Sequence, residues 1–329
     1  IGLSTGAATL TVSGANSGVY GNSGAMSVNV TGSADTIFGG SGRINATLGG
    51  SNDVAGASTS VTNLIVTGSG ATVFGNATGS QLAGDFEGSN AVIGLFTGSA
   101  NLTLGGGNAQ VFGNAGTTNI VATGAGNDAI HLYTGASSIT AGGTTNLLVS
   151  GNPAGALDFI GGAGSSTILG AGGTTMFGGS GGTITYIGQV GAAASFTAGA
   201  GNETLNAALS AGAVSGNGAT IGGGADVLVG GAGGDTLTAG AGITAMTGGA
   251  GANLFEFSHV VGGGTATVTD FNAADTVVLA GYGAAAAGNA LSGATFSGGA
   301  TTITLSDNTR ITFANVPSVA GLTGHVLST

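Results

Sequence analysis

The sequence predicts an all-β fold, a right-handed parallel β-solenoid, and three observations lead to it. The first is a run of four nine-residue units without a gap over residues 221–256: IGGGADVLV, GGAGGDTLT, AGAGITAMT and GGAGANLFE. The second is an 18-residue period in the N-terminal third, and the third is a composition with 73 glycines in 329 residues. A turn and a short strand repeated at a fixed period indicate a solenoid, here with about 18 coils.

Each nine-residue unit is expected to form one tight turn and one short strand. Glycine at positions two and four suits turn angles that other residues rarely adopt. The bulky eighth residue is expected to be an inward side chain of the strand. Two further units, 123–131 and 198–206, share the pattern, whereas the units at 132–149 keep the turn residues without an acid. The eighth residues of the four consecutive units are Leu228, Leu237, Met246 and Phe255.

The N-terminal third repeats the same coil as double units of 18 residues. An aromatic residue followed by glycine recurs in four of these coils, which predicts a row of rings stacked along the solenoid. The double units are 10–27, 28–45, 64–81 and 102–119, with a degenerate copy at 46–63 and a 20-residue unit at 82–101. The aromatic residues are Tyr20, Phe38, Phe74 and Phe112.

The nine-residue units resemble the G-G-x-G-x-D-x-U-x repeat of the RTX, or haemolysin-type calcium-binding, proteins, in which two units form one turn of a parallel β-roll. The resemblance implies that the acid at position six and carbonyl oxygens of the glycine turn bind Ca²⁺ between coils. Of the four consecutive units, only two keep this acid. The calcium ligands that the resemblance implies are Asp128, Glu203, Asp226, Asp235, Asn253, Asp270 and Asp275.

The implied calcium sites pair unequal ligands. Carried over residue by residue, Asp226 would face Thr244 and Asp235 would face Asn253. A site with one carboxylate attracts Ca²⁺ less than a site with two, so we expect weak binding of about one or two ions.

The C-terminal segment departs from the coils. Residues 253–283 resemble the block that closes the β-roll of RTX proteins, with a T-D-F turn at 269–271; its Asp270 and Asp275 would bind a terminal Ca²⁺, or, on the residues alone, cap a turn. A β-hairpin is expected over 300–316, and the chain end resembles a type I secretion signal. The expected parts are a solenoid at 1–283, with metal-free-looking coils at 1–120, RTX-like units at 121–256 and the closing block at 257–283, and a cap with the secretion-signal-like region at 284–329.

Charge and composition exclude several classes of function. The net charge is −11, and the only basic side chains besides three histidines are Arg43 and Arg310, so binding to nucleic acid or an anionic membrane is not expected. No cysteine is present, and no run of about 18 apolar residues occurs. The histidines are far apart in sequence and Asp85 and Glu87 form no recognisable catalytic pair, so we expect no enzyme.

These observations predict a secreted bacterial protein, extracellular or on the cell surface, that self-assembles with calcium into a fibre, surface layer or biofilm matrix. Head-to-tail contacts between copies are the expected mode, because solenoid ends offer unpaired strand edges. The alternative is a monomeric calcium-binding adhesin or spacer module. Cell-surface polysaccharide is a second possible partner, and binding of glycans or ice by threonine-rich faces is a further alternative.

Overall fold

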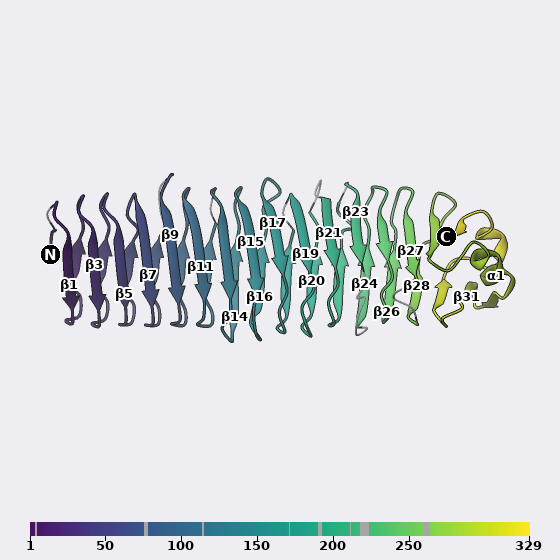
Figure 1. Cartoon of the computed structure of the whole chain (residues 1–329), viewed down its shortest axis with the longest axis horizontal. Helices are drawn as coiled ribbons and strands as arrows, with labels where there is room; N and C mark the ends of the chain where they lie inside the picture. The colour runs from purple at the N-terminus through teal and green to yellow at the C-terminus, as the bar shows by residue number, and fades with distance from the viewer. Residues whose placement is uncertain are drawn as a thin grey trace. The chain divides into compact units, whose positions relative to one another are not determined.

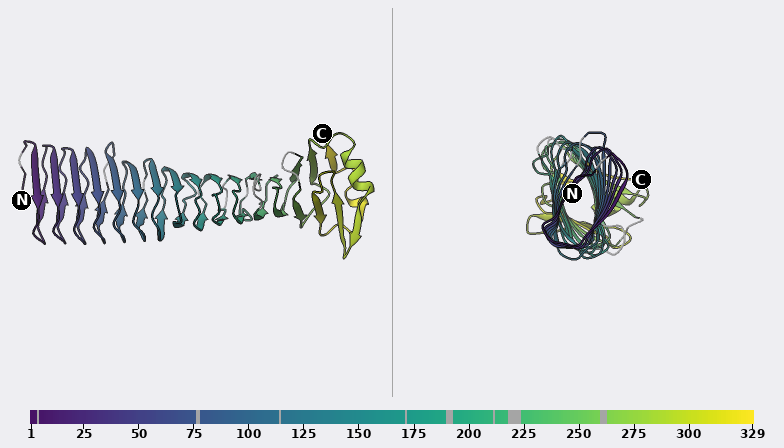
Figure 2. Two further views of the ribbon diagram at one scale, coloured as in Figure 1. Left: turned by 60° about the horizontal axis from the view of Figure 1, so that its bottom comes forward. Right: turned by 90° about the vertical axis from the view of Figure 1, so that its left-hand side faces the viewer.

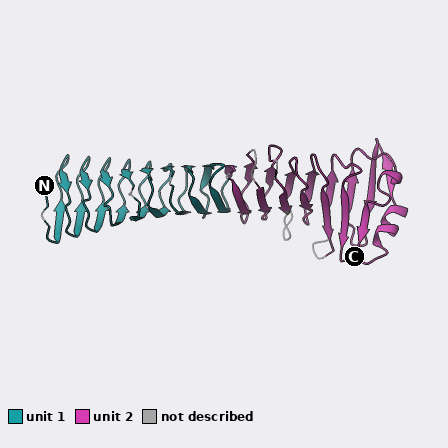
Figure 3. Ribbon diagram, turned by 90° about the horizontal axis from the view of Figure 1, so that it is seen from above, with its two compact units in different colours: residues 1–165 teal, residues 166–329 magenta. Residues whose placement is uncertain are grey.

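The computed structural model describes residues 1–3, 5–75, 78–113, 115–170, 172–189, 193–210, 212–217, 224–259 and 263–329. They form two compact units, residues 1–165 (unit 1) and 166–329 (unit 2) (Figure 3). In each unit, parallel strands are stacked coil upon coil, which confirms the predicted β-solenoid (Figure 1). Residues 221–223, at the start of the four consecutive units, lie outside the described residues.

Unit 1 contains two parallel sheets, and each coil contributes one strand to each sheet (Figure 2, purple to teal). The first sheet is β1 (Ala8–Val12), β3 (Met26–Val30), β5 (Ile44–Leu48), β7 (Val61–Val66), β9 (Gln81–Phe86), β11 (Ser99–Leu104), β13 (Thr118–Ala122), β15 (Ala136–Ala141) and β17 (Ala156–Ile160). The second sheet is β2 (Gly18–Tyr20), β4 (Thr36–Phe38), β6 (Val54–Gly56), β8 (Thr72–Phe74), β10 (Val92–Gly94), β12 (Gln110–Phe112), β14 (Asn127–His131) and β16 (Asn146–Ser150).

Unit 2 continues the same alternation of strands. Its first sheet is β19 (Gly173–Phe177), β21 (Ala193–Thr197), β23 (Val214–Asn217), β25 (Thr236–Thr238), β27 (Leu254–Ser258), β29 (Thr276–Ala280) and β33 (Val326–Ser328). Its second sheet includes β18 (Ser166–Leu169), β20 (Ile184–Ile187), β22 (Glu203–Asn206), β24 (Ala225–Val229), β26 (Ile243–Thr247), β28 (Thr265–Val268) and β32 (Arg310–Phe313).

The predicted number of coils is too high. The described residues form a β-solenoid of about 13 turns rather than 18. The 18-residue register holds in the first coils, where Met26 pairs with Ile44. Some later turns are longer, for example where Thr204 pairs with Val227, 23 residues further on. The last residues also leave the coil for a cap, so the chain length overestimates the number of turns.

The core lies between the two sheets of each unit. Side chains alternate between buried and exposed along the strands, and the predicted inward residues at position eight are all buried. Each fully buried Leu or Phe contributes about 1.5–3 kcal/mol relative to exposure. In unit 1 one inward column of the second sheet consists of Val19, Ile37, Ala55, Val73, Ile93, Val111, Ile130 and Val149.

Most turns in the first coils of unit 1 place asparagine in the left-handed backbone conformation. In each of the first six coils, one residue with φ between 57° and 71° lies two residues before the strand of the second sheet. Asparagine tolerates this left-handed conformation better than most side chains. These residues are Asn16, Ala34, Asn52, Gly70, Asn90 and Asn108.

At another position in the turns, glycine is required because the backbone of the preceding coil lies too close for a side chain, and not because of the backbone angles. A Cβ atom on Gly50 would overlap the carbonyl oxygen of Gly32, and one on Gly68 would overlap that of Gly50. The same holds for Gly88 and Gly106. We call these residues the stacking glycines. Their column lets backbone pack on backbone between successive coils.

On the outward face of the first sheet in unit 1, identical side chains of successive coils lie one above the other. Asn63 Nδ2 donates to Asn45 Oδ1 at 2.7 Å, and Asn119 Nδ2 donates to Asn101 Oδ1 at 2.8 Å. Each pair is 18 residues apart. The register therefore places equal side chains one above the other.

A cap ends unit 2. Helix α1 (Ala286–Ser292) and β30 (Thr295–Ser297) precede the predicted hairpin, which is confirmed because β31 (Ala300–Thr304) pairs antiparallel with β32. Strand β32 pairs with β28 and β33 pairs with β29, so both sheets receive a last strand from the cap. A 3₁₀ helix spans Val319–Gly321. None of the described helices is long and apolar enough to span a bilayer.

Candidate functional site

The side chains implied as calcium ligands lie at the turn-to-strand junctions, and most of them point inward. Asp128, Glu203, Asp226, Asp235, Asn253 and Asp275 are buried, whereas Asp270 is half-buried. The expected neighbours are also observed: Asp226 pairs with Thr244, and Asp235 donates its backbone N–H to Asn253 Oδ1 at 3.0 Å. The junctions therefore place the predicted residues one coil apart.

Five of these side chains accept the same type of hydrogen bond, which we call the junction bond. One carboxylate or amide oxygen accepts the backbone N–H of the equivalent residue one coil earlier. Such a bond satisfies a buried backbone donor and ties neighbouring coils together. The donor–acceptor pairs are Ala109 to Asp128 (2.7 Å), Glu203 to Asp226 (3.3 Å), Val214 to Asp235 (2.7 Å), Asp235 to Asn253 (3.0 Å) and Asn253 to Asp275 (2.9 Å).

Three of the aspartates use both carboxylate oxygens within the protein. The second oxygen of Asp235 accepts the N–H of Gly231 at 2.7 Å. That of Asp275 accepts the backbone N–H and the side-chain amide of Asn272 at 2.9 and 2.8 Å. Asp270 accepts the N–H groups of Gly248 and Gly249, both at 2.8 Å. These contacts match the turn-capping alternative.

Other buried acids keep oxygens without a hydrogen-bond partner among the described residues. They are Oδ2 of Asp35, Asp53 and Asp128, and both carboxylate oxygens of Glu203, which the N–H groups of Gly199 and Gly201 approach closely enough to oppose part of the rise in its pKa but not in hydrogen-bonding geometry. Burying an unpaired carboxylate is costly, so its proton is held more tightly. Burial raises the pKa of Asp128 and of Asp53, the latter also because Asp35 is near. Burial, reinforced by Asp226, raises the pKa of Glu203 to about 7.

Sequence reasoning missed Asp35 and Asp53, which lie in coils expected to look free of metal ligands. Both are buried, and both take part in junction bonds, from Ser17 at 2.6 Å and from Asp35 at 3.0 Å. The signal was an acid two residues before an inward apolar residue, Ile37 or Ala55. Requiring glycine at positions two and four hid it, because position four is Ser33 before Asp35 and Ser51 before Asp53.

The donor atoms around the unpaired acids fit a hard divalent cation. The two arginines are exposed, so neither neutralises a buried carboxylate. In the part of the chain that the structure describes, no three His, Cys, Asp or Glu side chains converge. Backbone carbonyl oxygens would have to complete the ligand set, as Ca²⁺ accepts. A Cβ on Gly32 would lie 2.6 Å from Asp35 Oδ2 and overlap the Gly14 carbonyl oxygen, so a carboxylate and a carbonyl border the same space.

The surroundings of Glu203 follow the same pattern. A Cβ on Gly201 would lie 2.9 Å from Glu203 Oε1 and would overlap the carbonyl oxygen of Gly182. Asp226 lies one coil further on and accepts the backbone N–H of Glu203 at 3.3 Å, so two acids and a glycine turn meet there. Asp35 with Asp53 and Glu203 with Asp226 are therefore the two candidate cation sites with paired acids.

The variants Asp53→Asn and Asp275→Asn are expected to change the stability of the calcium-free protein in opposite directions. In Asp53→Asn the junction bond can remain while the unpaired anionic oxygen is lost, so the calcium-free protein should gain about 1 kcal/mol and bind less Ca²⁺. In Asp275→Asn an amide would face the Asn272 donors, so stability should fall by about 1–3 kcal/mol. Calorimetric titration with Ca²⁺ and urea unfolding in EDTA measure both effects. Equal Ca²⁺ binding by Asp53→Asn and the parent protein would contradict the assignment.

The histidines and the outer acids lie elsewhere. His131 stacks on Phe112 with ring centroids 5.3 Å apart, and His259 packs edge-on against Tyr282 at 4.9 Å. His325 Nδ1 lies 3.1 Å from the carbonyl oxygen of Asp275. Asp85 and Glu87 are at the outer surface by the end of β9.

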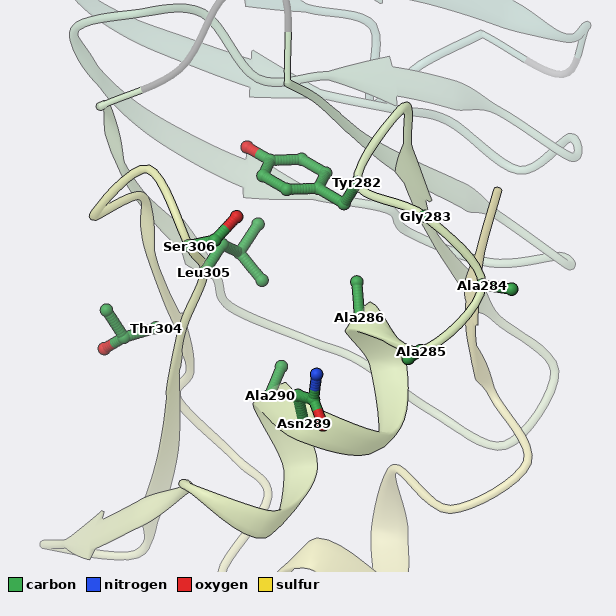
Figure 4. Close-up of a pocket in the computed structure, with 10 residues that line it drawn as sticks. All are labelled: Tyr282, Gly283, Ala284, Ala285, Ala286, Asn289, Ala290, Thr304, Leu305 and Ser306. Atoms are coloured by element: carbon green, nitrogen blue, oxygen red, sulfur yellow. The ribbon is translucent and has the colours of Figure 1, made fainter.

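A cavity of about 440 Å³ lies in the cap of unit 2 between residues 282–290 and 304–306 (Figure 4). Tyr282 donates its hydroxyl to Asp307 Oδ2 at 2.6 Å, and burial together with this bond raises the pKa of Tyr282 to about 12. Burial alone would raise the pKa of Asp307, but hydrogen bonds, led by that from Tyr282, lower it. The proton thus stays on Tyr282 at neutral pH, and the remaining lining is mainly alanine and glycine.

No protein-family model matches this chain, and no curated protein sequence matches it. The likeness to RTX proteins therefore depends on the nine-residue units themselves.

Proposed function

We propose that the chain is a secreted structural protein that assembles with calcium into a fibre, surface layer or biofilm matrix. The observation that supports this best is the set of buried acids with unpaired oxygens in a protein without lysine. Such oxygens gain most from a cation, because no basic side chain of the protein neutralises them. Bound Ca²⁺ would supply positive charge and join the turns of neighbouring coils.

In this proposal the protein's own residues prepare each site. The junction bonds fix one oxygen of Asp53 or Asp226 against the preceding coil, which orients the carboxylate. On the other acid of each pair, Gly32 leaves the Gly14 carbonyl oxygen beside Asp35, and Gly201 leaves the Gly182 carbonyl oxygen beside Glu203. Calcium would then stabilise the coils and reduce the repulsion that a net charge of −11 creates between copies.

The lateral surface of unit 1 supports association between copies better than the cap of unit 2. Helix α1 and strands β30 to β33 follow β29 and form the cap of unit 2, so a head-to-tail contact there would have to involve the cap. Unit 1 exposes aromatic side chains along its second sheet, with Tyr20 52% and Phe74 44% exposed. Exposed apolar side chains in a row are typical of contact surfaces. We therefore place the assembly contact on the sides of the coils.

Negative-stain microscopy of the purified chain, first in EDTA and then in millimolar Ca²⁺, tests the proposal. We expect single particles in EDTA and regular filaments or sheets with Ca²⁺. Asp275→Asn serves as a control for general loss of stability, because its carboxylate is satisfied within the protein. Single particles in both conditions would contradict assembly and favour the monomeric calcium-binding adhesin or spacer module.

A further inference from the structure

The outward row of aromatic residues on the second sheet of unit 1 has an open gap. In register along the row are Tyr20, Phe38, Gly56, Phe74, Gly94, Phe112 and His131. Tyr20 and Phe38 stack with centroids 6.1 Å apart. The ring of Phe38 covers Gly56, because a Cβ there would overlap it. A Cβ on Gly94 would meet only the Val73 carbonyl oxygen, at 4.0 Å, so Gly94 is uncovered.

A groove of about 400 Å³ begins at this gap. Gly94 and Gly113 contribute backbone to its floor, and the rings of Phe96, Phe112 and Tyr133 line it. Tyr133 is 60% and Phe96 57% exposed. The ring of Tyr133 lies against Gly113, where a Cβ would overlap it. The groove therefore offers ring faces and flat backbone, with Leu95, Thr97 and Ala115 as its other lining residues.

Contacts next to the groove hold some of its parts in place. His131 stacks on Phe112 with planes 12° apart, which fixes the orientation of the Phe112 ring. Thr97 Oγ1 accepts a hydrogen bond from Thr78 Oγ1 at 3.0 Å, so the Thr97 hydroxyl remains a donor at the rim. None of the lining residues is ionisable near neutral pH. The site thus combines aromatic faces with a neutral polar edge.

We propose that this groove binds a neutral pyranose ring of a polysaccharide. A pyranose has a face of polarised C–H bonds that suits the electron-rich face of an aromatic ring, and hydroxyl groups at its edge that suit Thr97 and backbone groups. The net charge of −11 disfavours anionic sugars. The volume is that of a small-ligand site, whereas a stable contact with a second copy needs about 800 Å² on each partner. The proposal does not depend on calcium or on assembly.

Titration calorimetry of the full chain with maltohexaose, cellohexaose and laminarihexaose tests this site. At least one oligosaccharide is expected to bind. In Gly94→Val the side chain would fill the floor of the groove without removing a ring, so binding should weaken at least about tenfold. Valine is compatible with a β-strand, so the far-ultraviolet circular dichroism should stay unchanged. Tyr133→Ala should weaken binding about tenfold through loss of stacking. The matched control Phe177→Ala removes an exposed ring on β19 of unit 2, outside the groove and outside the row, and should leave the affinity unchanged.

Two results would overturn the proposal. One is the absence of binding to all three oligosaccharides, or unchanged affinity in Gly94→Val. The other is seen by sedimentation velocity: loss of self-association in both Gly94→Val and Tyr133→Ala, with no sugar binding by the parent chain, would identify the groove as a contact between copies.

Discussion

Replacing Glu203 with glutamine is expected to stabilise the calcium-free protein at neutral pH. Burial, with Asp226 nearby, raises the pKa of Glu203 from 4.5 to about 7 in the folded protein. The unfolded chain therefore ionises at a lower pH than the folded chain, and ionisation favours unfolding. The penalty in the free energy of unfolding is on the order of 3 kcal/mol. Glutamine has nearly the same shape and carries no such penalty.

The pH dependence gives this effect a sign that can be measured. Below pH 4.5 Glu203 is protonated in both states and the parent protein pays no penalty. Between pH 4.5 and about 7 the unfolded state loses its proton first, so stability falls as the pH rises, and above pH 7 the difference is constant. Urea unfolding in EDTA at several pH values should therefore show Glu203→Gln and the parent protein diverging across this window.

In millimolar Ca²⁺ the parent protein is expected to become more stable than Glu203→Gln, the reverse of their order in EDTA. Binding of Ca²⁺ to the folded state raises the free energy of unfolding. Well above the Kd, this increase grows with the logarithm of the Ca²⁺ concentration. Glu203→Gln loses one anionic ligand and should gain less from millimolar Ca²⁺ than the parent. Glu256→Gln, whose side chain is only part-buried on β27, is the matched control and should change neither curve. If Ca²⁺ stabilised Glu203→Gln and the parent protein equally, Glu203 would not be a Ca²⁺ ligand.

Replacing the stacking glycine Gly68 with alanine is expected to destabilise unit 1 strongly. The added methyl group would overlap the carbonyl oxygen of Gly50, and backbone cannot move aside as a side chain can. Separating two coils at this point would also strain the ladder bonds on both sides. We expect a loss of at least about 3 kcal/mol in the free energy of unfolding.

The matched substitution is Gly94→Ala, in a strand of the same unit. Its methyl group would meet only one atom, at 4.0 Å, and alanine costs less backbone entropy than glycine. The free energy of unfolding should stay equal or rise by up to about 1 kcal/mol. Thermal and urea unfolding of the two variants provide the comparison. Similar stability of Gly68→Ala and Gly94→Ala would show that the coils can separate without cost.

The repeating features of the structure could be predicted from the sequence, because a period fixes which residues meet. Inward Leu228 and Phe255, and the pairing of Asp226 with Thr244, follow from the nine-residue register alone. The number of turns could not be predicted, since extra residues in long turns add length without adding a coil. The junctions at Asp35 and Asp53 were missed for a different reason. Ser33 and Ser51 stand at position four, where the pattern requires glycine, so the position-six acid was present without its usual neighbours.

Because equivalent residues of successive coils lie next to one another in unit 1, a whole coil can be gained or lost in evolution without disturbing its neighbours. Asn45 lies beneath Asn63, and Met26 beside Ile44, each 18 residues on. Duplication of a gene segment that encodes one such coil would give every new side chain the neighbours that its parent already had. Deletion of a coil would do the same in reverse. The length of the protein, and with it the number of paired acids and exposed rings, can therefore change in whole steps during evolution without a new fold.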